Sequence, residues 1–282
     1  MAAKYKPTYT LQVKCGDCSG LIYKITKVLY DHSVNIISQD EYVAKDNEQF
    51  FTRATFEGSI DELKLKERLR AALSENAEIK IIPKKKKKIV VLATKEHHCL
   101  ADLLIRHHFN ELNADIQAVI SNHNHLRELT EKFELPFHHL STKALTREQH
   151  ETKVREQLSQ YNFEYLILAK YMRILTPAFV AVFEDRIINI HHSFLPSFIG
   201  ANPYRQAFNR GVKIIGATAH FVTDELDEGP IIEQGVIRID HTMTTKAMAK
   251  AGKNVERDVM IKALHLVFED KVMLNGRRTV VF

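Results

Sequence analysis

Apolar residues in the first third of the chain alternate between strand spacing and helix spacing. Leu11 and Val13 share one face of a strand predicted over residues 9–14, and an apolar helical face follows over 21–29. The remaining elements are two strands joined by a polar turn, a charged helix and a short strand, over 34–42, 50–56, 61–73 and 79–82. This order predicts a ferredoxin-like βαββαβ domain of about the smallest size that folds alone.

After residue 88 the pattern changes to strands and helices in regular alternation. Residues 89–93 form a continuous apolar run, typical of a strand buried on both faces of a sheet. Further strands are predicted at 116–120, 137–140, 165–169 and 187–190, with helices at 99–109, 126–133 and 147–160. The pattern predicts an α/β fold with a doubly wound, mostly parallel sheet. Ligands of such sheets bind beyond the carboxyl ends of the strands, where we expect the chemistry.

Five consecutive lysines, at 84–88, separate the two patterns. A run of this kind is usually a solvated linker; attraction to phosphates or to a membrane surface is the alternative. We therefore expect an N-terminal domain over 1–83, a linker over 84–88 and a catalytic domain over 89–282.

Composition narrows the class of protein. Of 282 residues, 45% are hydrophobic and 27% charged, as in soluble globular proteins. A net charge of +5 is too small to indicate a nucleic-acid partner, and no stretch approaches the ~20 apolar residues of a membrane helix. Residues 1–7 lack a secretory apolar core, and the three cysteines (Cys15, Cys18 and Cys99) cannot all pair. We expect a cytoplasmic protein.

The densest group of chemically useful residues lies at the end of the strand predicted over 187–190. Asn189 and His191 are two residues apart, so their side chains share one face. An amide can donate to a developing oxyanion and an imidazole can move a proton, which suits attack on a carbonyl. The alternative is that Asn189 satisfies a turn and His191 fills a crevice.

An acidic loop follows between strands predicted at 214–223 and 231–239. Its Asp227 precedes Gly229 and Pro230, which restrict the backbone. A carboxylate there would orient His191 or activate a water molecule. The alternative is an ordinary acidic turn.

The N-terminal pattern resembles the ACT domain, a small regulatory module that often binds amino acids between two copies. The resemblance rests on the order of elements, on Asp-Cys-Ser-Gly-Leu at 17–21 entering the first helix, and on Asn-Ile-Ile at 35–37 opening the second strand. It implies a regulatory or assembly role and an amino-acid effector. A sheet of this kind exposes an edge that a second copy covers, so we expect a homo-oligomer.

Four later motifs together resemble the signature of the formyltransferases that use formyltetrahydrofolate. They are Asn189-x-His191, Ser-Phe-Leu-Pro at 193–196, His-Phe-Val-Thr at 220–223 and Leu226-Asp227-x-Gly229. The resemblance implies that Asn189, His191 and Asp227 form the catalytic trio, and that residues 171–177 line the pterin pocket. The substrate-binding residues it implies are Tyr171, Met172, Arg173, Ile174, Leu175, His192, Ser193, His220 and Thr223.

Within this family the chain resembles the 10-formyltetrahydrofolate deformylases. This resemblance rests on four features. They are the fused ACT-like domain, His192 at a position where the purine-pathway transferase has proline, Gly-Ala-Asn-Pro-Tyr at 200–204, and the tail 271–282. In addition, the turn 94–99 has no glycine and contains one carboxylate. A turn of this composition binds a phosphate-bearing acceptor poorly. The implied reaction is hydrolysis of 10-formyltetrahydrofolate to tetrahydrofolate and formate, with water as co-substrate and no cofactor. It would supply formate for purine synthesis and balance the one-carbon folate pool.

Other functions stay open at this level. The chain could pass the formyl group to an amine, or it could be a ligand sensor without catalytic activity. The presence of Asn189, His191 and Asp227 argues against an inactive sensor. A Cys15-x-x-Cys18 pair is a weak redox signal. His191, His192, His220 and Asp227 could ligate zinc, but the resemblance implies chemistry without metal.

Overall fold

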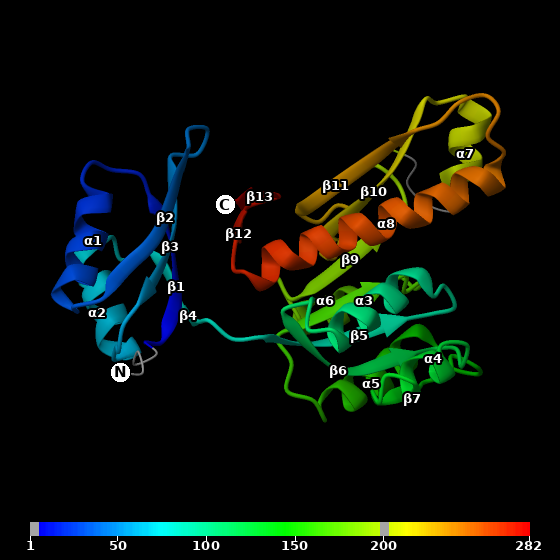
Figure 1. Ribbon diagram of the computed structural model, residues 1–282, viewed down its shortest axis with the longest axis horizontal. Helices are drawn as coiled ribbons and strands as arrows, with labels where there is room; N and C mark the ends of the chain where they lie inside the picture. The colour runs from blue at the N-terminus through cyan, green and yellow to red at the C-terminus, as the bar shows by residue number, and fades with distance from the viewer. Residues whose placement is uncertain (1–5, 198–202) are drawn as a thin grey trace. The chain divides into compact units, whose positions relative to one another are not determined.

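A computed structural model describes residues 6–197 and 203–282, and its contacts divide the chain into two compact units (Figure 1). The first runs to Lys85 and also contains Asp270–Asn275 and Val280–Phe282; the second contains Lys86–Glu269 and Gly276–Thr279. This division differs from the expected ranges 1–83, 84–88 and 89–282 in two places. Part of the tail belongs to the first unit, and a strand of the second unit begins inside the lysine run.

The first unit is an antiparallel sheet with two helices on one face (Figure 1). Its elements are β1 (Thr8–Gly16), α1 (Leu21–Asp31), β2 (Asn35–Ala44), β3 (Gln49–Glu57), α2 (Glu62–Ala72) and β4 (Glu78–Pro83). The strand order is β2-β3-β1-β4. Leu11 and Val13 pack there against Ile25 and Leu29, as their spacing predicts. The βαββαβ prediction is confirmed.

The C-terminal tail completes the other face of this sheet. Phe51 is fully buried there in a cluster with Met273 and Val280. The side chains of Gln12 and Arg53 each donate a hydrogen bond of 2.9 Å to the backbone carbonyl of Asp270. The tail strands are β12 (Val272–Asn275) and β13 (Arg278–Val281). The expected catalytic domain, 89–282, included the whole tail; the apolar residues of the tail carry no local sign of which sheet they cover.

The second unit is built on a seven-stranded sheet. Its strands are β5 (Lys87–Ala93), β6 (Ala114–Ser121), β7 (Phe137–His139), β8 (Tyr165–Ala169), β9 (Ile187–His191), β10 (Ile214–Phe221) and β11 (Ile231–Arg238). The order is β11-β10-β9-β8-β5-β6-β7, with β10 antiparallel to both its neighbours and the rest parallel. The predicted doubly wound, mostly parallel sheet is confirmed. β5 begins at Lys87, which is only 2% exposed, because a lysine can bury its long aliphatic stem.

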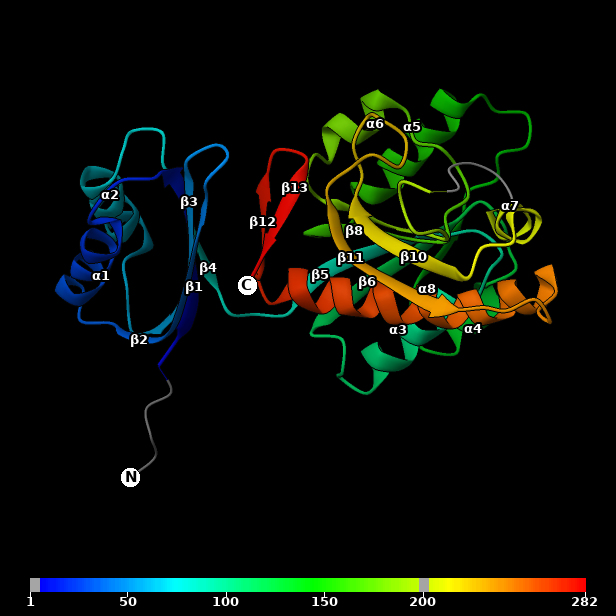
Figure 2. The same cartoon turned by 90° about the horizontal axis from the view of Figure 1, so that it is seen from above.

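Helices cover both faces of this sheet (Figures 1 and 2). One face carries α3 (His98–His108), α4 (Arg127–Glu131) and the 24-residue α8 (Thr245–Phe268); the other carries α5 (Arg147–Leu158) and α6 (Pro177–Val182). A further helix, α7 (Pro203–Arg210), packs against α8. Double coverage explains why residues 89–93 are all fully buried. No helix in the described parts of the chain is long and apolar enough to cross a membrane.

Candidate active site

Asn189 and His220 lie opposite each other on the antiparallel strands β9 and β10. The amide Nδ2 of Asn189 is 3.2 Å from Nε2 of His220, and Nδ1 of His220 is 2.8 Å from the carbonyl oxygen of Phe221. A carbonyl only accepts, so Nδ1 carries the proton and Nε2 accepts from the amide. Burial lowers the pKa of His220, which favours this neutral state. One amide hydrogen of Asn189 is thereby held, and the second is left for another acceptor.

His191 and Asp227 form the second contact of the site. Nδ1 of His191 is 3.3 Å from Oδ1 of Asp227, which is also 3.8 Å from Nε2 of His220. Burial opposes ionisation of Asp227, but the hydrogen bond and charge of His191 outweigh it and lower the carboxyl pKa. Nε2 of His191 is buried without a hydrogen-bond partner in the described residues. The site therefore offers an ionised carboxylate and an imidazole nitrogen still available to a ligand.

The loop carrying Asp227 is held in a restricted conformation. Asp227 itself has a φ of 57°, and two residues later a Cβ on Gly229 would lie 1.8 Å from the carbonyl oxygen of Phe221. Only glycine fits that close approach. On the outside of the loop, Arg277 forms ion pairs with Glu225, at 2.7 Å, and with Glu228.

A second loop, 193–197, is fixed by Thr218, which lies opposite His191 in the sheet. The Thr218 hydroxyl donates to the carbonyl of Ser193 at 3.0 Å, and accepts from the backbone N–H of Leu195 at 3.1 Å and from the amide of Gln234 at 2.9 Å. The Ser193 hydroxyl donates to the carbonyl of Ser197 at 2.8 Å. Ser193 thus uses its hydroxyl within its own loop.

The segment 171–175 lies at the carboxyl end of the neighbouring strand β8, whose Leu168 pairs with Asn189. Tyr171 and Leu175 pack into an apolar cluster that also receives Val222. The side chains of Met172 and Ile174 stay exposed, at 59% and 49%. Arg173 is half-buried, and the Thr223 hydroxyl donates to the carbonyl of Glu225.

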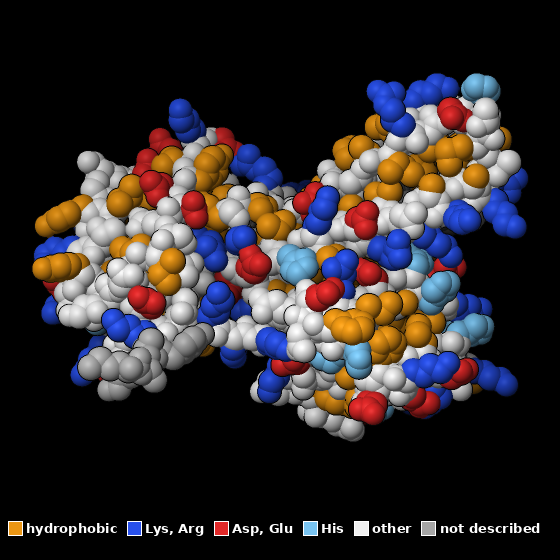
Figure 3. All heavy atoms as spheres, viewed as in Figure 1, with side chains coloured by type: hydrophobic (Ala, Val, Ile, Leu, Met, Phe, Trp, Pro, Cys, Tyr) orange, Lys and Arg blue, Asp and Glu red, His pale blue; other side chains and the backbone are white. Residues whose placement is uncertain are grey.

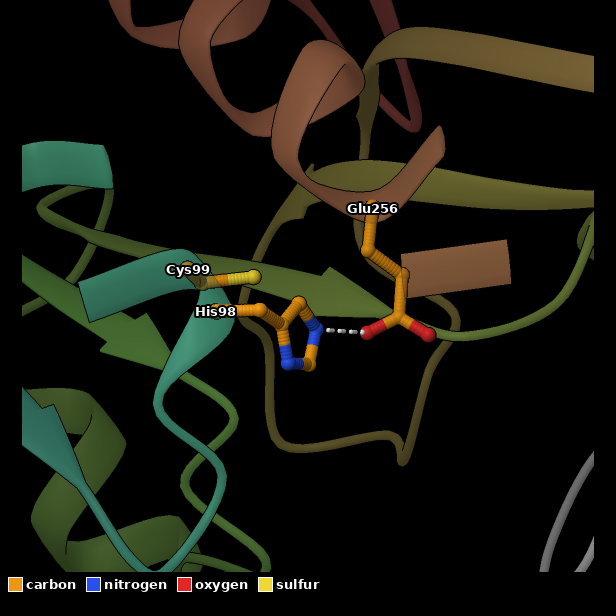
Figure 4. A group of neighbouring side chains, drawn as sticks. All are labelled: His98, Cys99 and Glu256. Atoms are coloured by element: carbon orange, nitrogen blue, oxygen red, sulfur yellow. Dashed lines mark hydrogen bonds and ion pairs between the residues drawn. The ribbon is translucent and has the colours of Figure 1, made fainter. Parts of the chain in front are cut away.

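A second polar cluster is buried at the same edge of the sheet. Glu256 of α8 is 1% exposed; its Oε2 lies 2.8 Å from Nε2 of His98 and 3.1 Å from Nζ of Lys170, and its Oε1 accepts from the hydroxyl of Tyr204 at 2.7 Å. Figure 4 shows the His98 ring directed at this carboxylate. Burial opposes ionisation of Glu256, but the His98 hydrogen bond, the Lys170 charge and the Tyr204 hydrogen bond lower its pKa to about 2.

His98, Cys99 and Glu256 also form a group with metal-ligand chemistry, since their donor atoms lie within 4.8 Å of one another (Figure 4). Other features oppose a cation. Burial raises the pKa of the Cys99 thiol, so it stays protonated, and the Lys170 ammonium already pairs with the carboxylate. The sequence also suggested zinc ligation by His191, His192, His220 and Asp227. This set is opposed as well, because both ring nitrogens of His220 are already engaged.

His192 lies between the two polar groups. Its ring centroid is 5.3 Å from that of His191 and 6.1 Å from that of Tyr204. Burial and then the charge of Lys170 lower the pKa of His192 to about 4, so it is neutral near pH 7. A largely apolar cavity of about 210 Å³ opens beside it and is lined in part by Ser193, Tyr204 and Ile215.

Comparison with known proteins gives this site its class. Residues 87–264 match the family described as formyl transferase. A formyltetrahydrofolate deformylase of Haemophilus influenzae is 48% identical over 96% of this chain and 98% of its own. The crystal structure of another, from Pseudomonas syringae pv. tomato, matches with a TM-score of 0.94 at 37% identity, covering 100% of this chain and 96% of that chain. The chain belongs to the formyltetrahydrofolate deformylase family, and its N-terminal unit has the ACT-like fold of that family.

A transferase structure matches less of the molecule. The glycinamide ribonucleotide transformylase 1 of Symbiobacterium toebii has a TM-score of 0.67 and 29% identity, and it covers 70% of this chain and 94% of its own. Coverage of this extent is expected if the transformylase shares the second unit of this chain and lacks the N-terminal unit.

Sequence reasoning named the residues now found in direct contact, Asn189, His191, His220 and Asp227. It missed Thr218, Gln234 and three members of the buried cluster, Lys170, Tyr204 and Glu256. Two features of the sequence could have indicated these residues. Lys170 directly follows a buried strand, and Glu256 is a carboxylate on the buried side of α8 between Val255 and Val259. Residues 200–202 of the motif at 200–204, and 1–5 of the segment 1–7, lie outside the described residues.

Proposed function

We propose that this chain hydrolyses 10-formyltetrahydrofolate to tetrahydrofolate and formate, the reaction for which its relatives are named. The formate would feed purine synthesis, and the reaction would balance the one-carbon folate pool in the cytoplasm. The observation that carries the proposal is the arrangement of an amide, an imidazole and an ionised carboxylate around one point at the end of β9.

The three residues divide the chemistry between them. The second amide hydrogen of Asn189 binds the formyl oxygen, on which negative charge develops during attack. Asp227 takes a proton from the attacking water, whose oxygen bonds to the formyl carbon. The bond from that carbon to the folate nitrogen then breaks, and His191 gives the nitrogen a proton through Nε2. The contact between Asp227 and His191 orients the imidazole.

The folate ring system is proposed to bind along residues 171–175. Met172 and Ile174 offer exposed apolar surface, and Arg173 adds hydrogen-bond donors. His192, Ser193 and Thr223 complete the binding wall, and His220 contributes to it through its hydrogen bond with Asn189. Because the hydroxyls of Ser193 and Thr223 bond within their own loops, we propose that these two residues act by shaping the site.

No metal or other cofactor is included in this mechanism. The carboxylate, the amide and the imidazole supply the base, the oxyanion donor and the acid, so water is the only co-substrate. In the one metal-ligand group of the described residues, the charge of Lys170 and the protonated thiol of Cys99 oppose a cation.

The competing function is transfer of the formyl group to an amine, which the similarity to a transformylase structure favours. One assay separates the two: 10-formyltetrahydrofolate is supplied with and without glycinamide ribonucleotide, and both formate and formylated amine are measured. We expect formate in both cases. Quantitative capture by the amine would establish a transferase, and no turnover at all would support a silent sensor.

The N-terminal unit is proposed to make the protein a homo-oligomer, at least a dimer. Strand β2 is one of the two edges of its sheet, and apolar side chains are exposed on β2 and on α1, at the left of Figure 3. They include Ile37 and Tyr42 of β2 and Ile22, Tyr23 and Tyr30 of α1. Exposed edges and apolar patches are usually covered by a partner, here a second copy. A monodisperse monomer by light scattering at micromolar protein would contradict this.

An amino-acid effector is proposed at the same unit, on the ACT-like fold alone. Calorimetric titration with glycine and with methionine tests it. Heat of binding that saturates at a fixed stoichiometry supports the proposal, and flat titrations with both would remove these two effectors.

A further inference from the structure

The buried cluster of His98, Lys170, Tyr204 and Glu256, here called the Glu256 cluster, adjoins the site and has no part in the mechanism above. Strand register brings it there. Leu168 of β8 pairs with Asn189 of β9, so Lys170 follows β8 at the level at which His191 ends β9. The ring of His192 connects the two groups, through its contacts with His191 and Tyr204.

The Glu256 cluster is costly to bury. Lys170 is 6% exposed and Glu256 is 1% exposed. Desolvating two opposite charges cancels much of their attraction, so such a pair stabilises the fold little or not at all relative to apolar residues. A costly ion pair at the strand edge where ligands bind points to a role in the reaction.

The contacts of the Glu256 cluster make it rigid. Both carboxylate oxygens of Glu256 are engaged, and the backbone carbonyl of Lys170 accepts from the hydroxyl of Thr94 at 2.7 Å. Further out, Lys253 pairs with Glu96 at 2.6 Å. These groups fill the space beyond β5 and β8 with side chains that bond to one another.

An amine acceptor would need that space. Its nitrogen must come within roughly 3–3.5 Å of the formyl carbon, and the rest of the acceptor must extend away from Asn189 and His191. Toward β8 and β5 that direction is occupied by Lys170, His98 and Tyr204. Both carboxylate oxygens of Glu256 are already engaged, so no acceptor is left there for the N–H groups of an amine, whereas water is small enough not to need that space.

We propose that His98, Lys170, Tyr204 and Glu256 form a plug that closes the amine side of the site and restricts the acceptor to water. This inference rests on the proposed hydrolase function. With the plug removed, an amine nitrogen would bond to the formyl carbon, the bond to the folate nitrogen would break, and the proton lost by the amine would reach that nitrogen through His191. The products would be a formamide and tetrahydrofolate, with no other reactant required.

The test measures how the formyl group divides between water and a small amine. The variant is Lys170→Gly with Glu256→Gln, which removes both charges together; glycine suits position 170 because its φ is 59°. Hydroxylamine and glycinamide serve as probe amines, and formate and formylated amine are both quantified. We expect the ratio of formylated amine to formate to rise about tenfold or more over wild type, since opening a closed pocket changes discrimination by that order.

Two further variants keep the test decisive. Tyr204→Ala opens the plug without removing either charge, and it replaces the double variant if the latter fails to fold. Arg186→Gln is the control, because it removes a cation at the other end of β9. An unchanged ratio in folded variants that still release formate would overturn the plug. If wild type itself released no formate, the proposed hydrolase function would fail instead.

Discussion

Asn189 and His220 face each other across the β9–β10 pair, with 3.2 Å between the amide nitrogen and Nε2 of the ring. Since Nδ1 of His220 donates to the carbonyl of Phe221, the ring can only accept from Asn189. The amide is therefore fixed with its nitrogen, not its oxygen, toward His220. That orientation suits the oxyanion donor that we propose Asn189 to be, and in the proposed mechanism His220 is a positioning residue for Asn189.

The first prediction concerns this pair. Asn189→Ala should lower kcat by about 10²–10³-fold, the usual effect of removing one oxyanion donor, with a small change in KM. His220→Phe keeps the ring volume and removes the acceptor, and should lower kcat by less. Steady-state formate release measures both.

A double-mutant cycle separates positioning from general damage. If His220 acts through Asn189, then His220→Phe should add little to the loss already caused by Asn189→Ala. Full multiplication of the two effects would show that His220 acts independently of Asn189.

The second prediction concerns the carboxylate. Asp227→Asn keeps the shape of the side chain and removes the base, so turnover should fall by several decades, about 10⁴-fold, while folate affinity changes little. Asp224→Asn and Glu225→Gln are matched controls in the same loop; both residues are exposed and should retain near-normal turnover. Near-normal turnover of Asp227→Asn would mean that the trio is misassigned.

The fold was predictable wherever one periodicity dominates. The alternation at Leu11 and Val13 specifies a strand with one apolar face, and the unbroken apolar run at 89–93 specifies a strand buried on both faces. Both strands are found, as β1 and β5, but the polar face of β1 is buried as well, under the tail. The tail was not predictable in the same way. Val272 to Phe282 is a short apolar hairpin, and nothing local distinguishes packing on Phe51 from packing elsewhere.

The site was predictable where its residues lie within one strand. Asn189 and His191 share a face by their spacing alone, and the contact with Asp227 followed from a family resemblance. The Glu256 cluster combines residues from α3, the end of β8, α7 and α8, up to 158 positions apart between His98 and Glu256. Such proximity depends on tertiary packing, which no local pattern encodes.

The third prediction is a stability effect in acid. The pKa of Glu256 is lowered from 4.5 to about 2 in the folded protein. Ionised Glu256 therefore stabilises the fold above pH 4.5, and this contribution is lost as the pH falls from 4.5 toward 2. At about 1.36 kcal/mol for each pKa unit, the ionised form of Glu256 stabilises the fold by about 3 kcal/mol relative to its protonated form.

Urea unfolding across that pH range measures the effect. Wild type should lose stability more steeply between pH 4.5 and 2 than Glu256→Gln, which cannot ionise. The variant should be less stable at pH 7, because Lys170 is left buried without its partner. Equal slopes for the two proteins would contradict the lowered pKa.

The fourth prediction concerns the tail. Met273→Ala removes a buried side chain that packs with Phe51 and Val280, and should destabilise the N-terminal unit by about 2 kcal/mol, the lower end for such a truncation. Hydrogen exchange in β1 and β3 should quicken. The exposed Leu63→Ala is the control and should leave exchange unchanged. Unchanged exchange in Met273→Ala would mean that the tail does not complete this core.

The last prediction is that formate release survives exhaustive chelation. In the proposed mechanism the trio supplies a base, an acid and an oxyanion donor, so no step needs a Lewis acid. At the group with metal-ligand chemistry, a cation would have to displace Lys170 from Glu256 and deprotonate a buried thiol whose pKa is raised. Cys99→Ser, which weakens any soft-metal ligation there, should retain turnover and serves as the matched variant. Activity that disappears with a chelator and returns with zinc, but not with magnesium, would show that a metal takes part in the reaction.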